Sequence, residues 1–402
     1  MTFVLGVVLF AVGIGTSIAL HEAGHMYSAK AFGMKVRRYF IGFGPTLFSF
    51  RRGESEYGLK LIPAGGFCDI AGMTALEELP DPTDRRRAFF RFPVWQRVVV
   101  LSAGSLTHFI VGVLLIYAMA VSTGLPILDP PPAPAVVSQV SQCVTVQADG
   151  SCRPGAPAPA RDAGLRPGDR VLAVAGSPVR DFTDLAKAIQ SRSGPTEFRF
   201  ERAGQQLTTS IDIARVPLSA LGGQGDKLVG AIGVVPQRPS ALMPRSGPVK
   251  AVGQTVGFAG TMFVKTAQAV QELPNRVPAL LDRIGGQSRP DSPVSVVGAS
   301  VLGGDAVGFG AWWFFLFLLA ALNLFVGVFN LLPLLPLDGG HIAVVVAERI
   351  RAWFARLRGR PDPGLVDMAK LLPVSFSIFL VLMFFGVTLI LADIVNPVNI
   401  AG

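Results

Sequence analysis

The sequence predicts an α-helical polytopic membrane protein with about four transmembrane helices, a membrane-associated β-hairpin and one extracytoplasmic α/β domain. Half of the 402 residues are hydrophobic and only 16% are charged, against about 25% in soluble domains. Four uncharged stretches reach the length of about 20 residues that a bilayer crossing needs. They are Thr2–Leu20, Val98–Leu128, Gly310–Leu337 and Leu371–Ala392. Turn and strand patterns occupy the segments between them.

The first stretch is expected to be a transmembrane helix at 1–30 and not a cleaved signal peptide. Signal peptides begin with a basic region and end at a small-residue cleavage site, whereas the first basic residue here is Lys30. Cleavage would also sever the motif that begins at His21. The other spans are expected at 95–128, 310–348 and 371–394.

Basic residues set the expected orientation, because cytoplasmic loops near membrane ends are rich in Lys and Arg. Two loops have this excess, at 31–94 and 349–370. We therefore expect a multi-pass protein of the cell membrane, with both loops in the cytoplasm and both termini outside. The segment between the second and third spans is then extracytoplasmic. This topology accounts for the net charge of +9, so we expect contact with membrane lipid and no nucleic-acid partner.

The loop at 31–94 contains a predicted strand pair. Tyr57–Phe67 reads YGLKLIPAGGF, in which hydrophobic residues alternate and then meet Pro63 and the Gly65-Gly66 pair, a turn or bulge signal. Tyr39–Phe48 is aromatic-rich and interrupted by glycine, as a hairpin partner would be. Two interpretations stay open. The pair forms an edge that docks an extended partner, or it forms a small sheet that packs on the membrane surface.

The extracytoplasmic segment contains a compact domain expected at 135–217, which follows the stiff proline linker DPPPAPA. Its centre carries the turn GLRPGD, the strand RVLAVAG and a helix with Asp181 or Thr183 as N-cap. Further strands are expected at Glu197–Arg202 and Leu207–Ala214. The domain resembles a bacterial PDZ domain, which binds an extended chain end along a sheet edge.

Two features of this segment leave questions open. Cys143 and Cys152 lie nine positions apart, where an oxidising compartment would permit a disulfide; the alternative is two unrelated small residues. Residues 218–309 are expected to form a linker with an amphipathic stretch around Val252–Leu281, and no role is assigned to them.

The strongest chemical signal is the HExxH motif His21-Glu22-Ala23-Gly24-His25, at the end of the first apolar stretch. On a helix, positions i and i+4 share a face, so both imidazoles can reach one metal ion. The glutamate lies beside that ion, where it can take a proton from an attacking water. Zinc suits imidazole and carboxylate ligands and needs no redox chemistry for hydrolysis. Ionisable residues at membrane depth usually mark function.

A catalytic zinc usually has three protein ligands, and the third has several candidates. Asp338 is preferred, because Pro333 and Pro336 break the helix before it and present a carboxylate at membrane depth. His108 and His341 are the alternatives. An ordinary turn at the membrane boundary is the other interpretation of Asp338.

Together these motifs resemble the bacterial site-2 proteases, intramembrane zinc metalloproteases that release membrane-tethered regulators such as anti-sigma factors. The segments HEAGH, GFGP, YGLKLIPAGGF and NLLPLLPLDGGH and the PDZ-like domain carry the resemblance. It implies Zn2+ as cofactor and a transmembrane protein as substrate. The residues it assigns are the zinc ligands His21, His25 and Asp338, the general base Glu22, and the substrate- or oxyanion-binding Asn330, Gly65 and Gly66.

The sequence departs from the family pattern in two places. Pro333 and Pro336 are three positions apart where the family's prolines are two apart, and His108 stands where an amide is usual. Three functions compete with regulated proteolysis: general clearance of signal-peptide remnants, a non-catalytic PDZ scaffold, and a metal transporter. Glu22 argues against the scaffold, and two further histidines are too few to line a transport path.

Overall fold

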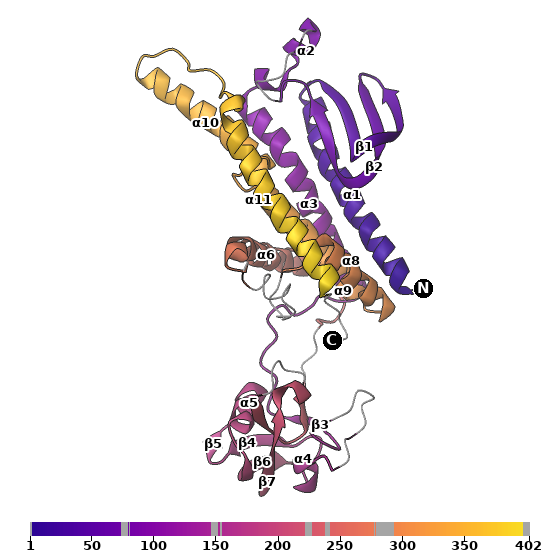
Figure 1. Ribbon diagram of the computed structural model, residues 1–402, viewed down its shortest axis with the longest axis vertical. Coiled ribbons are helices and arrows are strands. Elements are labelled where there is room, and N and C mark those ends of the chain that lie inside the picture. Colours follow the sequence, from indigo (N-terminus) through magenta and orange to yellow (C-terminus); the bar gives the residue numbers. More distant parts are fainter. Residues whose placement is uncertain are drawn as a thin grey trace. The chain divides into compact units, whose positions relative to one another are not determined.

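The computed structural model describes residues 2–73, 79, 81–145, 152, 155–221, 227–237, 242–276, 278 and 293–396. The chain forms two compact units (Figure 1). The helical unit joins Met1–Leu125 with Pro244–Gly402, and the α/β domain is Pro126–Met243. Each unit has a hydrophobic core of its own.

Four helices of the helical unit are long and apolar enough to cross a membrane, and each falls on one predicted stretch. They are α1 (Thr2–Ala31), α3 (Val94–Ser122), α9 (Trp312–Asn330) and α11 (Met368–Val395). Helices α1, α3 and α9 pack against one another, while α11 exposes large apolar side chains along its length. A helix that is apolar on all sides is typical of a membrane span.

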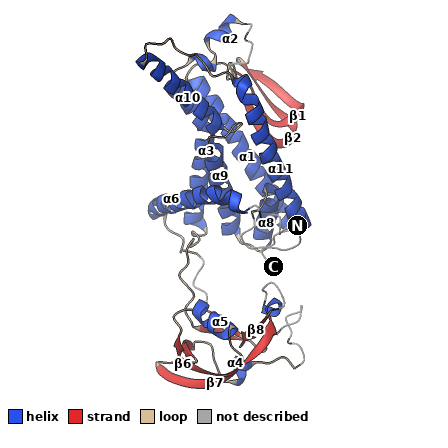
Figure 2. Cartoon of the chain, turned by 60° about the vertical axis from the view of Figure 1, so that its left-hand side comes forward, coloured by secondary structure: helices blue, strands red, loops and turns tan. Residues whose placement is uncertain are grey.

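The predicted hairpin lies beside α1 (Figures 1 and 2). Its strands β1 (Val36–Arg52) and β2 (Ser55–Ile70) pair antiparallel. Gly53 has a φ of 64° in the turn between them, a conformation that glycine adopts without steric cost. The Tyr39 hydroxyl donates a hydrogen bond to the Ala19 carbonyl at 2.7 Å, which fixes β1 against α1.

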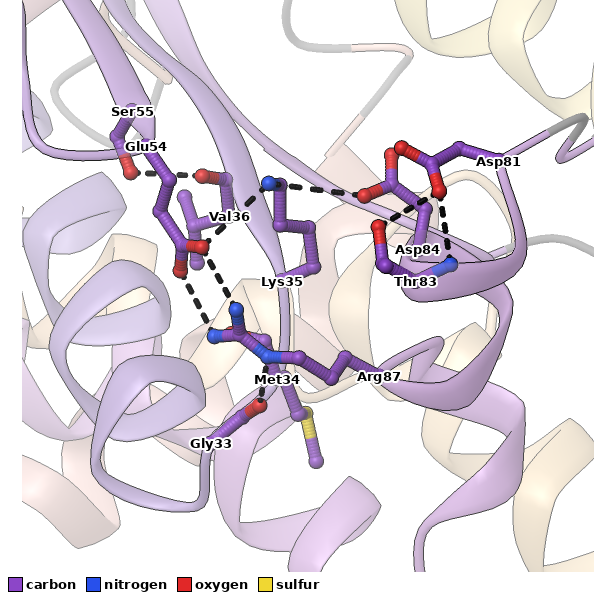
Figure 3. A network of polar contacts seen from close by, with 10 residues as sticks. All are labelled: Gly33, Met34, Lys35, Val36, Glu54, Ser55, Asp81, Thr83, Asp84 and Arg87. Carbon is purple, nitrogen blue, oxygen red and sulfur yellow. Dashed lines mark hydrogen bonds and ion pairs between the residues drawn. The ribbon is translucent and has the colours of Figure 1, made fainter.

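A network of charged side chains joins the hairpin to the segment before α3 (Figure 3). Arg87 donates to both carboxylate oxygens of Glu54, at 2.6 and 2.7 Å. Lys35 lies 3.4 Å from Glu54 and 3.6 Å from Asp84. Since Arg87 follows α2 (Pro82–Arg86), these contacts hold the segment before α3 against the hairpin turn.

The third predicted stretch is not one continuous helix. Helix α9 ends at Asn330, before the predicted end of the stretch at Leu337, and α10 (Asp338–Leu357) starts a second helix. Pro333 and Pro336 explain the break, because neither has the backbone N–H that a continuing helix needs. The break places Asp338 at the first position of α10.

Further helices of this unit belong to the region expected to be a linker at 218–309. They are α6 (Pro248–Glu272), η3 (Leu273–Arg276) and α8 (Val296–Gly308), in addition to η1 (Phe89–Arg91) before α3. Helix α6 packs against α3 and α9 and buries one face, including Phe258 and Met262. Helix α8 packs against α1. The predicted end of the amphipathic stretch at Leu281 lies outside the described residues.

The α/β domain contains a five-stranded antiparallel sheet in the order β5-β4-β6-β7-β8 and a separate pair, β3-β9. Figure 2 shows β6, β7 and β8 of this sheet. The strands are β3 (Val137–Val140), β4 (Arg170–Val174), β5 (Ser177–Pro178), β6 (Gly194–Arg202), β7 (Gln205–Pro217), β8 (Leu228–Ala231) and β9 (Val234–Pro236). The helices are α4 (Pro159–Asp162), α5 (Phe182–Gln190) and η2 (Leu218–Leu221). Asp181 is the N-cap of α5 and accepts from the Asp184 N–H at 2.9 Å.

The domain is wider than the expected 135–217, because β8 pairs with β7 and β9 pairs with β3. Its two ends meet at a bridge between Pro126 and Leu242. Cys143 and Cys152 form a disulfide, so the question left open by their spacing is answered in favour of the bond.

Candidate metal centre

The two histidines of the HExxH motif lie one turn apart on a single face of α1. Only 8% of His21 and 6% of His25 is exposed. With a rise of 1.5 Å per residue, His21 lies about 28 Å along the helix from Thr2. A bilayer core is about 30 Å thick. The distance from Thr2 to the histidine pair is therefore close to the thickness of such a core.

Three ligand atoms from α1 and α10 form a nearly equilateral triangle. The Nε2 atoms of His21 and His25 lie 3.2 Å apart, and each is 3.4 Å from Oδ2 of Asp338. A tetrahedral zinc with bonds of about 2.0–2.1 Å separates neighbouring ligand atoms by about 3.3–3.4 Å. Among the described residues, this is the group of His, Cys, Asp and Glu side chains that could hold a metal ion. The three side chains therefore fit zinc.

The turn between α9 and α10 delivers Asp338 to this triangle. Gly339 and Gly340 are buried, and a Cβ atom at either would collide with the backbone of Leu331 or Leu334. The turn therefore folds back tightly onto the start of α10. Oδ2 of Asp338 is buried without a hydrogen-bond donor among the described residues. A buried anionic oxygen without a donor costs free energy, which a bound cation offsets.

His25 is oriented by the backbone of α3. Its Nδ1 lies 2.7 Å from the Val100 carbonyl oxygen. Because a carbonyl only accepts, Nδ1 carries the proton, and Nε2 keeps its lone pair toward the triangle. Metal-ligating histidines usually have such a partner on the other ring nitrogen, which fixes both tautomer and ring orientation.

Two glycines allow α1 and α3 to approach at the site. A Cβ atom at Gly104 would collide with Nε2 of His25 and Cε1 of His21, and one at Gly24 would lie 2.6 Å from the Ala103 carbonyl oxygen. Neither glycine was among the predicted site residues. The run of small residues around Gly104 is the available signal, because small residues permit close helix packing in membranes.

The hairpin brings its glycine pair to the motif. A Cβ atom at Gly66 would lie 3.0 Å from Cγ of Glu22, so this part of β2 touches the predicted base. Gly65 faces Phe43 and has a φ of 133°. Asn330 is the last residue of α9, and its side chain makes no hydrogen bond to another described residue.

The two other candidates for the third ligand lie elsewhere. His341 lines a small cavity between α3 and α10. His108 is buried on α3, its ring centroid 5.0 Å from that of His21, and it bonds to Asn323 of α9. Neither belongs to the triangle. Asn323 was not predicted, since nothing local distinguishes it within an apolar helix.

Comparison with known proteins identifies the class of this molecule. Residues 9–360 match the model of peptidase family M50. The chain is 45% identical to "Zinc metalloprotease Rip1" of Mycobacterium bovis and 43% identical to that of Mycolicibacterium smegmatis, in both cases over all of both chains. It is 31% identical to "Probable membrane metalloprotease ARASP2, chloroplastic" of Arabidopsis thaliana, over 94% of this chain and 77% of that one.

The chain belongs to peptidase family M50, the site-2 proteases. The predicted resemblance is thus confirmed, as are the enzyme class, an intramembrane zinc metalloprotease, and zinc as its cofactor. One solved structure, the PDZ domain of the SdrC-like protein from Listeria monocytogenes, matches 27% of this chain and 93% of that one. The identity is 14% and the TM-score 0.18, a similarity that carries no fold assignment.

Proposed function

We propose that the enzyme cuts a peptide bond within a transmembrane segment of another membrane protein, at a zinc ion held by His21, His25 and Asp338. The triangle of ligand atoms, with sides of 3.2, 3.4 and 3.4 Å, carries this proposal. The hydrogen bond from His25 Nδ1 to the Val100 carbonyl supports the proposal, because it leaves the lone pair of Nε2 available for the metal ion.

Glu22 is the proposed general base. Zinc, when bound, supplies a Lewis acid that eases the ionisation of water and polarises a carbonyl group. Glu22 follows His21 directly on α1 and accepts the proton of the attacking water. Asn330, at the end of α9, is proposed to donate its amide to the developing oxyanion.

The hairpin is proposed to hold the substrate as an extended strand. A helical peptide bond is shielded by its own turns, so the substrate must unwind before attack. A strand laid beside Gly65 and Gly66 would lie next to Glu22, because Gly66 touches that side chain. Strand addition to a sheet satisfies the backbone of the unwound segment.

The proposed topology places the hairpin, the loop at 349–370 and the metal site toward the cytoplasm, with the α/β domain outside. Clusters of Lys and Arg in the two loops support it. Membrane-impermeant reagents added from outside should label a cysteine introduced at Ser177, an exposed position of the α/β domain, and leave one at Arg358 unlabelled. Labelling at Arg358 from outside would overturn this orientation.

The substrates we propose are single-span regulators such as anti-sigma factors, with remnants of signal peptides as the other class. The α/β domain, with its capped helix and antiparallel sheet, is proposed to be a PDZ domain. We assign it the role of a filter that keeps substrates away until their outer portions have been trimmed.

The decisive experiment compares the purified enzyme with its Glu22→Gln variant on a model transmembrane substrate. The variant should keep the zinc content of the parent, because the change removes a base and not a ligand. Its cleavage rate should fall by about 10²–10⁴-fold, the usual contribution of a general base. Asp338→Ala should lose both zinc and cleavage. Full zinc and full activity in Asp338→Ala would show that the third ligand is another residue.

A further inference from the structure

The two histidines of the motif are held in different ways. His25 donates from Nδ1 to the Val100 carbonyl at 2.7 Å. Nδ1 of His21 is buried beside the backbone of Gly104, without a hydrogen bond of comparable geometry among the described residues. A ligating histidine normally needs a partner on its second nitrogen to fix the plane of the ring. Hydrogen bonding therefore holds the ring of His21 less firmly than that of His25, and packing has a larger part in fixing its plane.

The ring of His108 packs against the His21 ring and restricts its orientation. His108 follows Gly104 by one turn on α3, and its ring centroid lies 5.0 Å from that of His21, with 43° between the planes. Gly104 closes another side, since a Cβ atom there would collide with Cε1 of His21. The imidazole of His21 is therefore packed between the glycine surface of α3 and the His108 ring.

His108 is in turn fixed by Asn323 of α9. The Asn323 amide nitrogen donates to the Leu319 carbonyl at 2.8 Å, so the amide oxygen is the atom directed at His108. This oxygen lies 3.0 Å from Nδ1 of His108, which must donate. The two side chains are 3% and 2% exposed. The amide thus sets the tautomer and orientation of a buried ring.

We propose that His108 and Asn323 form a positioning pair that holds the His21 imidazole in its ligating orientation. For His21, packing against this pair takes the role that the hydrogen bond donated to the Val100 carbonyl has for His25. This inference rests on the proposed zinc site and adds two residues to it, one from α3 and one from α9. Neither residue binds the metal in this assignment.

A purely structural role would give a different result. If the pair only joined α3 to α9, its loss would destabilise the helices and leave the zinc affinity of the folded protein unchanged. If the pair positions His21, its loss weakens zinc binding even in folded protein. Changes to such outer partners typically cost about 10–100-fold in metal affinity.

The test uses the full-length protein in detergent and four variants. His108→Ala removes the ring, Asn323→Leu releases it, and His108→Phe keeps a flat ring without the hydrogen bond. The double variant His108→Phe with Asn323→Leu replaces both partners by apolar groups, which restores packing without a buried unpaired oxygen. Zinc affinity is measured by competition with a chromophoric chelator, and folding by thermal unfolding of the zinc-free protein. The absorption spectrum of the Co2+-substituted protein reports the geometry of the metal site.

The expected order of zinc affinity is parent, then the double variant, then His108→Phe and Asn323→Leu, each of which leaves one buried polar group unpaired. His108→Ala should lie lowest, about 10–100-fold below the parent. The Co2+ spectrum of His108→Ala should change. Asp393→Asn is the matched control: Asp393 accepts from the Ser295 N–H in a buried contact between α11 and α8, which carry none of the triangle. It should lower thermal stability and leave zinc affinity unchanged.

Parent-like zinc affinity and an unchanged Co2+ spectrum in His108→Ala would overturn the positioning role, whatever happens to stability. If that variant fails to fold, the same result in Asn323→Leu overturns the positioning role. A parent protein that binds no zinc would instead refute the proposed function itself, so the two failures are distinguishable.

Discussion

The two units use buried polar side chains in opposite ways. In the α/β domain, buried Asp169 accepts from Nε and Nη2 of Arg202 and from the Arg166 N–H, each at 2.7 Å. In the helical unit, Nδ1 of His21 and Oδ2 of Asp338 are buried without a well-formed hydrogen bond among the described residues. A saturated network stabilises a fold. An unsaturated group costs free energy unless another group completes it, which at the His21, His25 and Asp338 side chains favours a bound cation.

Removal of the whole α/β domain should change the substrate range of the enzyme more than any other variant. Pro126 and Leu242 are bridge partners, so a short Gly-Ser linker can replace the domain between them. Because the domain contributes no residue to the triangle, trimmed substrate should be cleaved at nearly the parent rate. Untrimmed substrate, uncleaved by the parent, should now be cut. Gel assays on a matched pair of trimmed and untrimmed substrates measure both.

The competing role for the domain is recruitment of a newly exposed chain end. Excision would then slow cleavage of trimmed substrate and leave untrimmed substrate uncut. We favour the filter, since confinement of both proteins to one membrane already raises their effective concentration. A variant that still retains zinc but fails on both substrates would exclude the filter.

The sequence predicted those parts of the site that have a local pattern. HExxH places His21 and His25 on one helical face, and the prolines before Asp338 predict a helix break. Pairings between distant segments could not be predicted in this way. His25 meets Val100 at a separation of 75 residues, and His108 meets Asn323 at 215. Only the packing of α1, α3 and α9 brings these atoms together.

For the fold, too, features with a local sequence pattern were predicted and those that depend on distant pairings were not. Composition alone predicts four spans, because 20 apolar residues have few alternatives to a transmembrane helix. The end of α9 at Asn330 depends on how the following turn packs against α10, which composition does not encode. For the α/β domain, β8 and β9 lie beyond the predicted limit of 217, since each is recognised by its pairing with a distant strand.

A second prediction tests how much a buried ion pair contributes to the stability of the helical unit. Glu348 of α10 accepts from Arg97 of α3 and from the Val366 N–H, both at 2.9 Å. Glu348→Ala leaves a buried guanidinium without its anion, which costs about 3–5 kcal/mol. The melting temperature of the detergent-solubilised protein should fall accordingly, as measured by far-UV circular dichroism.

Two variants control this measurement. Arg351→Ala lies on an exposed position of the same helix and should change stability by less than about 0.5 kcal/mol. Replacing Arg97 and Glu348 together by methionine and leucine should recover much of the loss, because apolar pairs often replace buried ion pairs at little cost. If Glu348→Ala melts like Arg351→Ala, the pair contributes nothing to the docking of α10.

The smallest expected effect is a pH dependence of the α/β domain. Burial by itself would raise the pKa of Asp169, but hydrogen bonds from Arg202 and from the Arg166 N–H outweigh it and lower the pKa below its usual value. A lowered pKa in the folded state means that this carboxylate stabilises the domain above the unfolded-state pKa, about 3.9. That stability is lost as the pH falls through the lower folded-state pKa.

Arg202→Leu should therefore shift acid unfolding of the domain to higher pH. The segment Pro126–Met243 has its own apolar core around Leu185, Phe198 and Ile211, so it can be expressed alone and followed by circular dichroism between pH 2 and 7. Arg180→Leu is the control, because the Arg180 side chain is 88% exposed in its pair with Asp184, and exposed pairs contribute little. Identical acid midpoints for the two variants would mean that the Asp169 network is not the stabilising contact that its geometry implies. In that case a buried carboxylate with three hydrogen-bond donors would stabilise the domain no more than an exposed one. The difference between Asp169 and the buried polar atoms of the metal centre would then have no energetic basis.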